Sequence, residues 1–252
     1  MLEERRWLIG SAGWNIPRAH RARFPSEGSQ LARYAGRLNA TEINTSFYRP
    51  HAPGTYERWA AQVPMEFRFA VKVPRLITHE RALVGTRDPL HRFLDESAGL
   101  GAKRGPLLVQ LPPSLAFDAR RVGRFLALLR SSHGGPVVCE PRHVSWTSEI
   151  ASGLLTQFEI ARVAADPPRA AGLSEPAGWP GLAYYRMHGS PRPYFSPYSP
   201  ARMAELEAGL RRCTVPCWCI FDNTGSGSAA GHAVELTDRL ADIGPIPRPQ
   251  QD

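Results

Sequence analysis

The sequence predicts a (β/α)8 barrel, the TIM-barrel fold, because two patterns alternate along the whole chain. Short apolar runs typical of buried parallel strands are separated by segments with apolar residues at helical spacing. Eight such units in 252 residues match the usual size of this fold. We interpret residues 1–252 as a single domain, because neither a linker nor a change in composition divides them.

The apolar runs define the expected elements in order. The predicted strands cover residues 7–10, 41–46, 67–72, 107–110, 137–140, 160–166, 182–188 and 217–222. The predicted helices cover residues 31–38, 56–63, 90–100, 122–129, 150–158, 203–210 and 229–240. Residues 167–180 lack helical spacing. We therefore expect an irregular or missing helix after the sixth strand.

An open, doubly wound sheet is the alternative architecture, and two observations favour the barrel over it. No G-x-G-x-x-G motif follows the first strand. Polar residues also end nearly every predicted strand, whereas an open sheet gathers them at one switch point.

Composition sets limits on the class of protein. The chain is 42% hydrophobic and 21% charged, which is ordinary for a globular protein. No run approaches the roughly 20 apolar residues of a membrane span, and the first residues lack a signal-peptide pattern, so we expect a cytoplasmic protein without membrane contacts. Four cysteines without a second metal-spaced pair indicate reduced thiols. The net charge of +8 favours polyanionic partners only weakly, because the basic residues are scattered.

Catalytic groups of a barrel lie at the carboxyl ends of its strands, where the βα loops begin. Polar residues at the predicted strand ends are Ser11, Glu42, Asn44, Lys72, Gln110, Glu140, Asp166, Arg186, His188, Asp222 and Asn223. So many polar groups at one end cost folding energy unless they pair or bind a ligand. The structural alternative is a network in which Lys72 and Arg186 only neutralise the carboxylates.

Two loops extend the predicted site. Residues 140–146 contain Glu140, Arg142, His143 and Trp146. A planar or sugar-like group would stack on Trp146 while Glu140 or His143 transfers a proton. The alternative for this loop is an Arg142 salt bridge and a packed tryptophan.

The second loop, residues 223–228, is rich in Gly and Ser and leads into a predicted helix. Free backbone N–H groups at such a helix start favour an anion, and barrels often bind phosphate at this point. Gly and Ser are also common in loops without ligands.

Eight short motifs occur in an order that resembles the YecE-like family, domain of unknown function 72. They are Gly10-Ser-Ala-Gly-Trp14, Glu42-Ile-Asn44-Thr-Ser-Phe47-Tyr48, Phe67-x-Phe-Ala-Val-Lys72, Ile77-Thr-His79, Gln110-Leu-Pro-Pro113, Glu140-x-Arg-His143-x-Ser-Trp146, Arg186-x-His-Gly189 and Phe221-Asp-Asn-Thr224. The resemblance covers essentially the whole chain and implies a TIM barrel, but no established reaction. The first motif usually reads Gly-x-Ser-Gly in this family, whereas this chain has Ala12 at the Ser position.

The leading hypothesis from the residues is an acid/base enzyme, a hydrolase, lyase or isomerase, that acts on an anionic phosphorylated or sugar-like substrate. Its expected catalytic residues are Glu42, Lys72, Glu140 and His188. Its expected substrate-binding residues are Asn44, Tyr48, Gln110, Arg142, His143, Trp146, Asp166, Arg186, Asp222 and Asn223.

Three other classes stay open from the sequence. A metal-dependent enzyme would use Glu140, Asp166, His188 and Asp222 as ligands for Mg, Mn or Zn, although the sequence requires no cofactor. A nucleic-acid binding or processing protein, related by fold analogy to barrel endonucleases, would account for the basic charge. A small-ligand sensor would keep the pocket without turnover.

Overall fold

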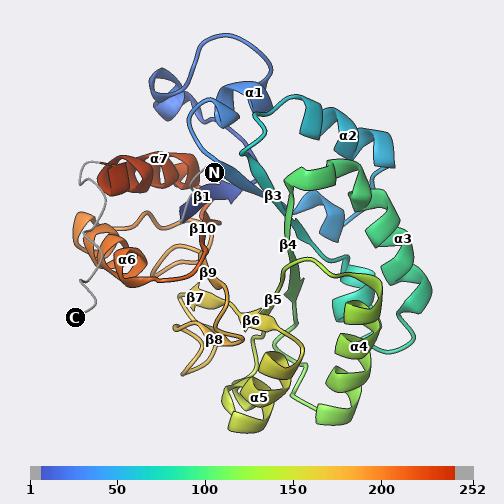
Figure 1. The fold of residues 1–252 in the computed structure, drawn as a ribbon. Helices are drawn as coiled ribbons and strands as arrows, with labels where there is room; N and C mark the ends of the chain where they lie inside the picture. The colour runs from blue at the N-terminus through green and yellow to red at the C-terminus, as the bar shows by residue number, and fades with distance from the viewer. Residues whose placement is uncertain (1–6, 242–252) are drawn as a thin grey trace, which may run out of the picture.

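The computed structural model describes residues 7–241, which form a ring of strands surrounded by helices (Figure 1). The strands are β1 (Trp7–Ala12), β2 (Ala40–Ile43), β3 (Arg68–Lys72), β4 (Arg104–Gln110), β5 (Val137–Glu140), β6 (Ile160–Arg162), β7 (Ala164–Asp166), β8 (Ala177–Gly178), β9 (Ala183–Met187) and β10 (Cys217–Phe221). The α-helices are α1 (Gln30–Ala35), α2 (Pro53–Ala61), α3 (Arg87–Ser97), α4 (Ala119–Ser132), α5 (Glu149–Gln157), α6 (Pro200–Arg212) and α7 (Ser228–Ala241).

Shorter helical turns lie in the connections. The 3₁₀ helices are η1 (Arg18–Arg23), η2 (Thr45–Phe47), η4 (Ala98–Lys103) and η5 (Val144–Thr147), and η3 (Leu76–Glu80) is a π-helix. Two of these turns, η2 and η3, directly follow β2 and β3. They therefore lie at the end of the barrel where the predicted site residues lie.

Side-chain caps set the start of four α-helices. Ser29, Asp118, Ser148 and Ser199 each accept a hydrogen bond from a backbone N–H in the first turn of α1, α4, α5 and α6. Such a cap satisfies one of the backbone donors that have no partner within the helix.

The hydrogen-bonded strand order is β7-β9-β10-β1-β2-β3-β4-β5-β6-β8. β6 pairs in parallel with β5, and β7 pairs in parallel with β9. Because only Val163 separates β6 from β7, this one stretch of chain closes the ring. The predicted barrel is confirmed, with the sixth strand divided in two, and the open-sheet alternative is wrong.

The connection after the sixth strand contains no α-helix, as predicted. Its only regular element is β8, which pairs antiparallel with β6. Arg162 in β6 donates hydrogen bonds from Nη2 to the backbone oxygens of Gly172 (2.8 Å) and Glu175 (3.4 Å), which anchors this connection. Figure 1 shows β8 and its loops between α5 and α6, where a complete barrel would have a helix.

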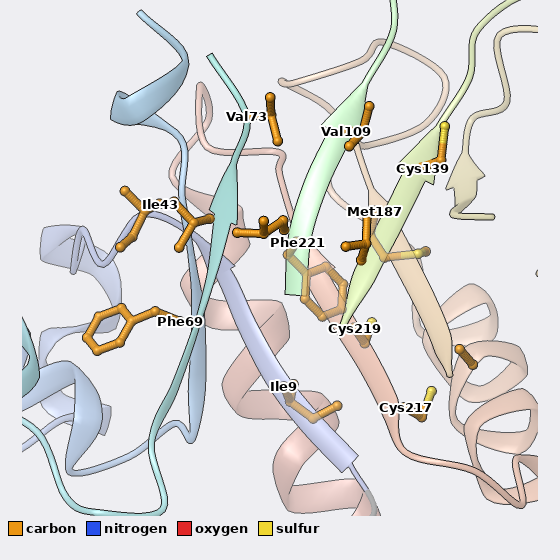
Figure 2. Packing of buried hydrophobic residues seen from close by; sticks show 14 of the residues in the cluster. Ile9, Ile43, Phe69, Val73, Val109, Cys139, Met187, Cys217, Cys219 and Phe221 are labelled. Carbon is orange, nitrogen blue, oxygen red and sulfur yellow. The ribbon is translucent and has the colours of Figure 1, made fainter. Parts of the chain in front are cut away.

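The main apolar core lies between the strands and the surrounding helices. Every second residue of a strand faces this layer. Figure 2 shows part of the layer, with Ile9, Phe69 and Phe221 on three of the strands. Cys139 and Cys219 are buried thiols in the same layer. Within residues 7–241, none of the helices combines the length and the apolar composition that a membrane span requires.

A second apolar cluster fills the barrel interior. Its largest members, Tyr184 and Trp218, stack with their ring centroids 5.8 Å apart. Residues with small side chains, such as Ala40 and Ala70, leave room for these rings. A Cβ atom on Gly105 would lie only 2.6 Å from the Trp218 ring, so the packing requires glycine there. This packed interior supports the polar groups at the carboxyl ends of the strands.

Candidate active site

A cluster of polar side chains lies directly above the apolar interior of the barrel. Six of its residues each follow an interior apolar residue by two positions, so they point to the same side of their strands. With His188, which follows Arg186 by two positions, the cluster comprises Glu42, Lys72, Gln110, Glu140, Arg186, His188 and Asp222, and all seven are buried. The structure therefore brings together all four predicted catalytic residues and three of the predicted binding residues.

Arg186 lies at the centre of this cluster and has no exposed surface. Its guanidinium donates two parallel hydrogen bonds to Glu42, from Nε to Oε2 (3.1 Å) and from Nη2 to Oε1 (2.6 Å). It also donates to Glu140 Oε2 (2.7 Å) and Asp222 Oδ2 (3.0 Å). One cation thus joins three carboxylates, from β2, from β5 and from the residue after β10, a role that suits the planar, forked guanidinium.

His188 bridges two of the same carboxylates. Its Nε2 lies 2.9 Å from Glu140 Oε1, and its Nδ1 lies 3.0 Å from Asp222 Oδ2. A neutral imidazole has one N–H donor, whereas the imidazolium has two and satisfies both carboxylates. Burial lowers the pKa of His188, but Glu140 and the two hydrogen bonds outweigh it, so the pKa is raised above its usual 6.5.

Glu140 has the largest number of partners in the cluster. Besides Arg186 and His188, it accepts hydrogen bonds from Gln110 Nε2 (3.2 Å) and Arg142 Nη2 (3.3 Å). Burial opposes ionisation of this carboxyl, but the charge of Arg186 outweighs that effect and holds the pKa of Glu140 well below 4.5. Glu140 is therefore a carboxylate at neutral pH.

Lys72 is arranged differently from the other cations. Its Nζ lies over the ring of Phe47, 4.2 Å from the centroid. No carboxylate of the described residues lies within ion-pair distance of it. Burial and the nearby Arg186 lower the pKa of Lys72 to about 8, although Glu42, Glu140 and Asp222 act in the opposite direction. Lys72 thus offers an amine that can lose its proton near neutral pH.

Four further side chains belong to the site, and our sequence reasoning gave none of them a role. Tyr184 donates its hydroxyl to Glu42 Oε2 (2.9 Å), and the Tyr194 hydroxyl lies 3.5 Å from Arg142 Nη2. His79 and Phe47 pack edge to face with ring centroids 5.0 Å apart. Burial and the charge of Lys72 lower the pKa of His79 to about 4, so this imidazole is neutral. Only Tyr184 had a usable sequence signal, because it precedes Arg186 by two residues.

A cavity of about 580 Å³ lies near the cluster, although none of the seven cluster residues lines it. Phe47 forms part of its wall and also contacts the Lys72 amine. The rest of the wall comes from η2, η3 and α3, with exposed Tyr48 and Leu76 among its apolar groups and Arg49 among its charged ones. The volume suits a small organic molecule. Tyr48, which we predicted to bind substrate, therefore lines this cavity but lies outside the buried cluster.

The loop after β5 does not present the predicted stacking surface. Trp146 is 1% exposed, donates Nε1–H to the backbone oxygen of Leu115 (3.0 Å) and packs against Phe117. Its indole is therefore part of the core and is not available to a ligand. His143 caps η5, with Nδ1 2.8 Å from Ser145 Oγ. Of this loop, only Glu140 and Arg142 reach the cluster.

Strand alternation explains three further residues that lie outside the cluster. Ala161 and Val163 face the interior, so Asp166 faces outward, where its Oδ2 accepts hydrogen bonds from Arg202 of α6. Ser11 contacts Tyr34 in the helical layer, with 3.0 Å between the hydroxyls. Asn223 donates to the backbone oxygen of Ser196 (3.0 Å), and its Nδ2 lies 3.2 Å from His232 Nδ1 in α7.

Asn44 is partly buried at the start of η2, and its Oδ1 has no hydrogen-bond partner. In the predicted anion loop, the Ser226 and Ser228 hydroxyls lie 2.9 Å apart before α7. Among residues 7–241, no group of three or more His, Cys, Asp or Glu side chains is arranged to hold a metal ion. The four predicted metal ligands do not all come together, because the side chain of Asp166 points away from His188 and Asp222.

Fold and site together define a (β/α)8 barrel protein with a buried ionisable cluster at the carboxyl ends of its strands. The chain belongs to a family described as protein of unknown function DUF72, whose model matches residues 8–251. This confirms the resemblance drawn from the eight motifs.

Relatives agree with this assignment. The UPF0759 protein YecE of Escherichia coli K12 is 34% identical over 104 residues, which span 41% of this chain and just over a third, 37%, of YecE. A DUF72 family protein from Enterococcus faecalis V583 superposes with a TM-score of 0.79 at 19% identity, covering 98% of this chain and 100% of that one. A sugar phosphate isomerase/epimerase from Parabacteroides distasonis ATCC 8503 superposes with a TM-score of 0.56 at 12% identity, covering 95% and 94%. At these identities, the two structures show the shared fold alone.

Proposed function

We propose that this barrel is an acid/base enzyme that transfers protons on a small, anionic, sugar-like substrate, with a phosphorylated sugar as the best candidate. The observation that carries the proposal is the imidazole of His188 held between Glu140 and Asp222 at 2.9 and 3.0 Å. A histidine fixed by carboxylates at a barrel mouth is a typical proton donor and acceptor. The isomerase and lyase reactions both require such a group next to a carbonyl.

The residues of the cluster divide by the partners of their side chains. Glu42 accepts hydrogen bonds from Arg186 and Tyr184, whereas Glu140 and Asp222 also contact the His188 imidazole, so Glu42 acts as a positioning residue. His188 and Glu140 transfer protons when a substrate displaces one of their mutual contacts. Catalytic hydrogen bonds often take their final form only in the substrate complex.

Charge at the site favours an anionic substrate. With His188 protonated, the four cations Lys72, Arg142, Arg186 and His188 exceed the three carboxylates by one. Arg142 Nε is buried and has no hydrogen-bond partner in the described structure. An incoming phosphate or carboxylate oxygen would satisfy this donor, because a guanidinium binds such groups well. The sugar phosphate isomerase/epimerase with the same fold supports this substrate class by analogy.

The test is proton exchange on a panel of aldose and ketose phosphates, from trioses to hexoses, incubated in D2O and followed by NMR. We expect the wild-type protein to exchange a proton next to the carbonyl carbon of at least one compound. Glu140→Gln should lower this rate by about 10²- to 10⁴-fold, the usual contribution of general acid/base groups. Glu205→Gln, an exposed carboxylate on α6, is the matched control and should retain the rate. Equal rates in both variants would remove the assignment of Glu140.

A second candidate function, nucleic-acid binding or processing, is favoured by one specific observation. A cavity of about 440 Å³ between the β3–α3 connection and α4 is lined by Arg87, Arg120, Arg121 and Arg124. If this surface binds a phosphate backbone, affinity should fall steeply with salt concentration. Binding of single- and double-stranded oligonucleotides at two salt concentrations tests this candidate, and an absent salt dependence rejects it.

A further inference from the structure

The amine of Lys72 has no counter-ion at a place where counter-ions are abundant. Its residue is 6% exposed, and its Nζ contacts the Phe47 ring. The nearby carboxylates of Glu42, Glu140 and Asp222 are bound instead by Arg186 and His188. A buried ammonium without a paired carboxylate costs folding free energy, so its presence calls for a role other than stability.

The second lysine of the chain provides the contrast. Lys103 donates its Nζ to the backbone oxygens of Ala60 and Val63, at 2.6 Å each. Those two hydrogen bonds hold η4 against α2 and the segment after it. The other 29 basic residues of the chain are arginines, which cannot provide a nucleophilic amine.

We propose that Lys72 is a catalytic nucleophile whose Nζ forms an imine with the carbonyl carbon of an aldehyde or ketone substrate. This inference rests on the proposed function, because the same site must bind the sugar-like carbonyl compound and move its protons. It deepens that function by assigning the substrate a free carbonyl group and the reaction a covalent intermediate.

The reaction balances with groups present at the site. Neutral Nζ adds to the carbonyl carbon while the carbonyl oxygen takes a proton from His188, and the nitrogen then returns one proton to His188, which gives the neutral carbinolamine. The hydroxyl leaves as one water molecule with a proton from His188, and the nitrogen lone pair forms the C=N bond of the protonated imine. Protonated, this imine draws electrons from the adjacent C–H or C–C bond, which is the step that isomerases and lyases need. Hydrolysis returns the amine and the carbonyl product.

Three features of the site support this chemistry. A pKa of about 8 leaves roughly a tenth of the Lys72 side chains as free amine at neutral pH. Phe47, whose ring contacts the amine, also lines the 580 Å³ cavity, so that cavity begins one side chain away from the nucleophile. His79 packs on the same ring and is neutral, so it adds no charge that would oppose the cationic imine.

The experiment is reductive trapping. The wild-type protein is incubated with glyceraldehyde 3-phosphate, dihydroxyacetone phosphate or ribose 5-phosphate and sodium cyanoborohydride, then analysed by mass spectrometry. Reduction of an imine adds the mass of the carbonyl compound less one oxygen atom. Peptide mapping should place this mass on Lys72 at least about tenfold faster than on Lys103, because the Lys103 ammonium is committed to two carbonyls.

Variants make the result specific. Lys72→Arg keeps a cation at the site and should abolish fast labelling, whereas Lys103→Arg should label at the wild-type rate. Equal labelling rates for the two lysines in the wild-type protein overturn the imine, and that comparison depends on no variant. If Lys72 stays unlabelled by a compound whose proton exchange still depends on Glu140, the imine is overturned and the proposed function stands. If no sugar phosphate exchanges protons and none labels Lys72, both proposals are overturned.

Discussion

Arg186 and Glu42 form a fully buried ion pair with two parallel hydrogen bonds, 3.1 and 2.6 Å long, and neither residue has exposed surface. The pair links β9 to β2, strands on either side of β10 and β1 in the ring. Because the same guanidinium also neutralises Glu140 and Asp222, all three carboxylates of the cluster depend on one side chain. That arrangement makes the site sensitive to a single substitution.

Replacing Arg186 by Met should lower the free energy of unfolding by about 3–5 kcal/mol, because three buried carboxylates lose their shared cation. Urea denaturation followed by tryptophan fluorescence measures this change. The matched control is Arg202→Met, which removes a partly exposed ion pair with Asp166 and should cost less than about 1 kcal/mol. Similar losses in the two variants would show that the Arg186 network has no special importance for stability.

The order of strands and helices was largely readable from the sequence, because buried parallel strands and amphipathic helices have different apolar periods. The division of the sixth strand was not. Residues 160–166 read as one continuous run, yet β6 pairs with β5 and β7 pairs with β9. Which neighbour a strand residue pairs with depends on tertiary closure of the ring, and the local sequence does not contain that information.

The sequence indicated which residues meet in the buried cluster where a polar residue follows an interior one by two positions at a strand end, as for Lys72 after Ala70 and Asp222 after Ile220. It gave no such indication where both faces of a strand are apolar. The run before Asp166 is apolar on both sides, so the direction of its side chain could not be derived from alternation. Trp146 follows its strand by several residues, and only the local turn directs its indole into the core.

Lys72 and Lys103 should respond in opposite directions to the same substitution. Lys72→Met removes a buried ammonium with no paired carboxylate and should raise the free energy of unfolding by about 1 kcal/mol or more at neutral pH. Lys103→Met leaves two backbone oxygens without their donor and should lower it by about 1–3 kcal/mol. Chemical denaturation measures both changes. A loss of stability in Lys72→Met would mean that this amine is mainly structural.

His188 should make a pH-dependent contribution to stability. Its pKa is raised in the folded state, mainly by Glu140 acting against burial, so the imidazolium is favoured by folding. The resulting stabilisation is fully present below about pH 6.5, the unfolded value, and is lost as pH rises through the higher pKa of the folded protein. The difference in unfolding free energy between wild type and His188→Gln should therefore shrink as the pH rises from about 6 into the alkaline range. A difference that grows over this interval would contradict the bridging imidazolium.

The apolar interior of the barrel below the cluster has no room for a methyl group added at Gly105. A Cβ atom there would lie 2.6 Å from the Trp218 ring and 3.2 Å from the Phe69 backbone oxygen. Trp218 cannot move freely, because it stacks on Tyr184, whose hydroxyl holds Glu42. Gly105→Ala should therefore cost about 1–3 kcal/mol of stability and also lower activity through Glu42.

The matched control for this substitution is Gly153→Ala, at an exposed position of α5 with no atom within 4 Å of the added Cβ. In a helix, this change should raise stability by about 0.5–1 kcal/mol, because alanine has the higher helix propensity. Thermal unfolding and proton exchange measured on both variants separate the two effects. If Gly105→Ala lost neither stability nor activity, the barrel interior would have to be loosely packed. The packing of Tyr184 would then not determine the position of the Glu42 carboxylate.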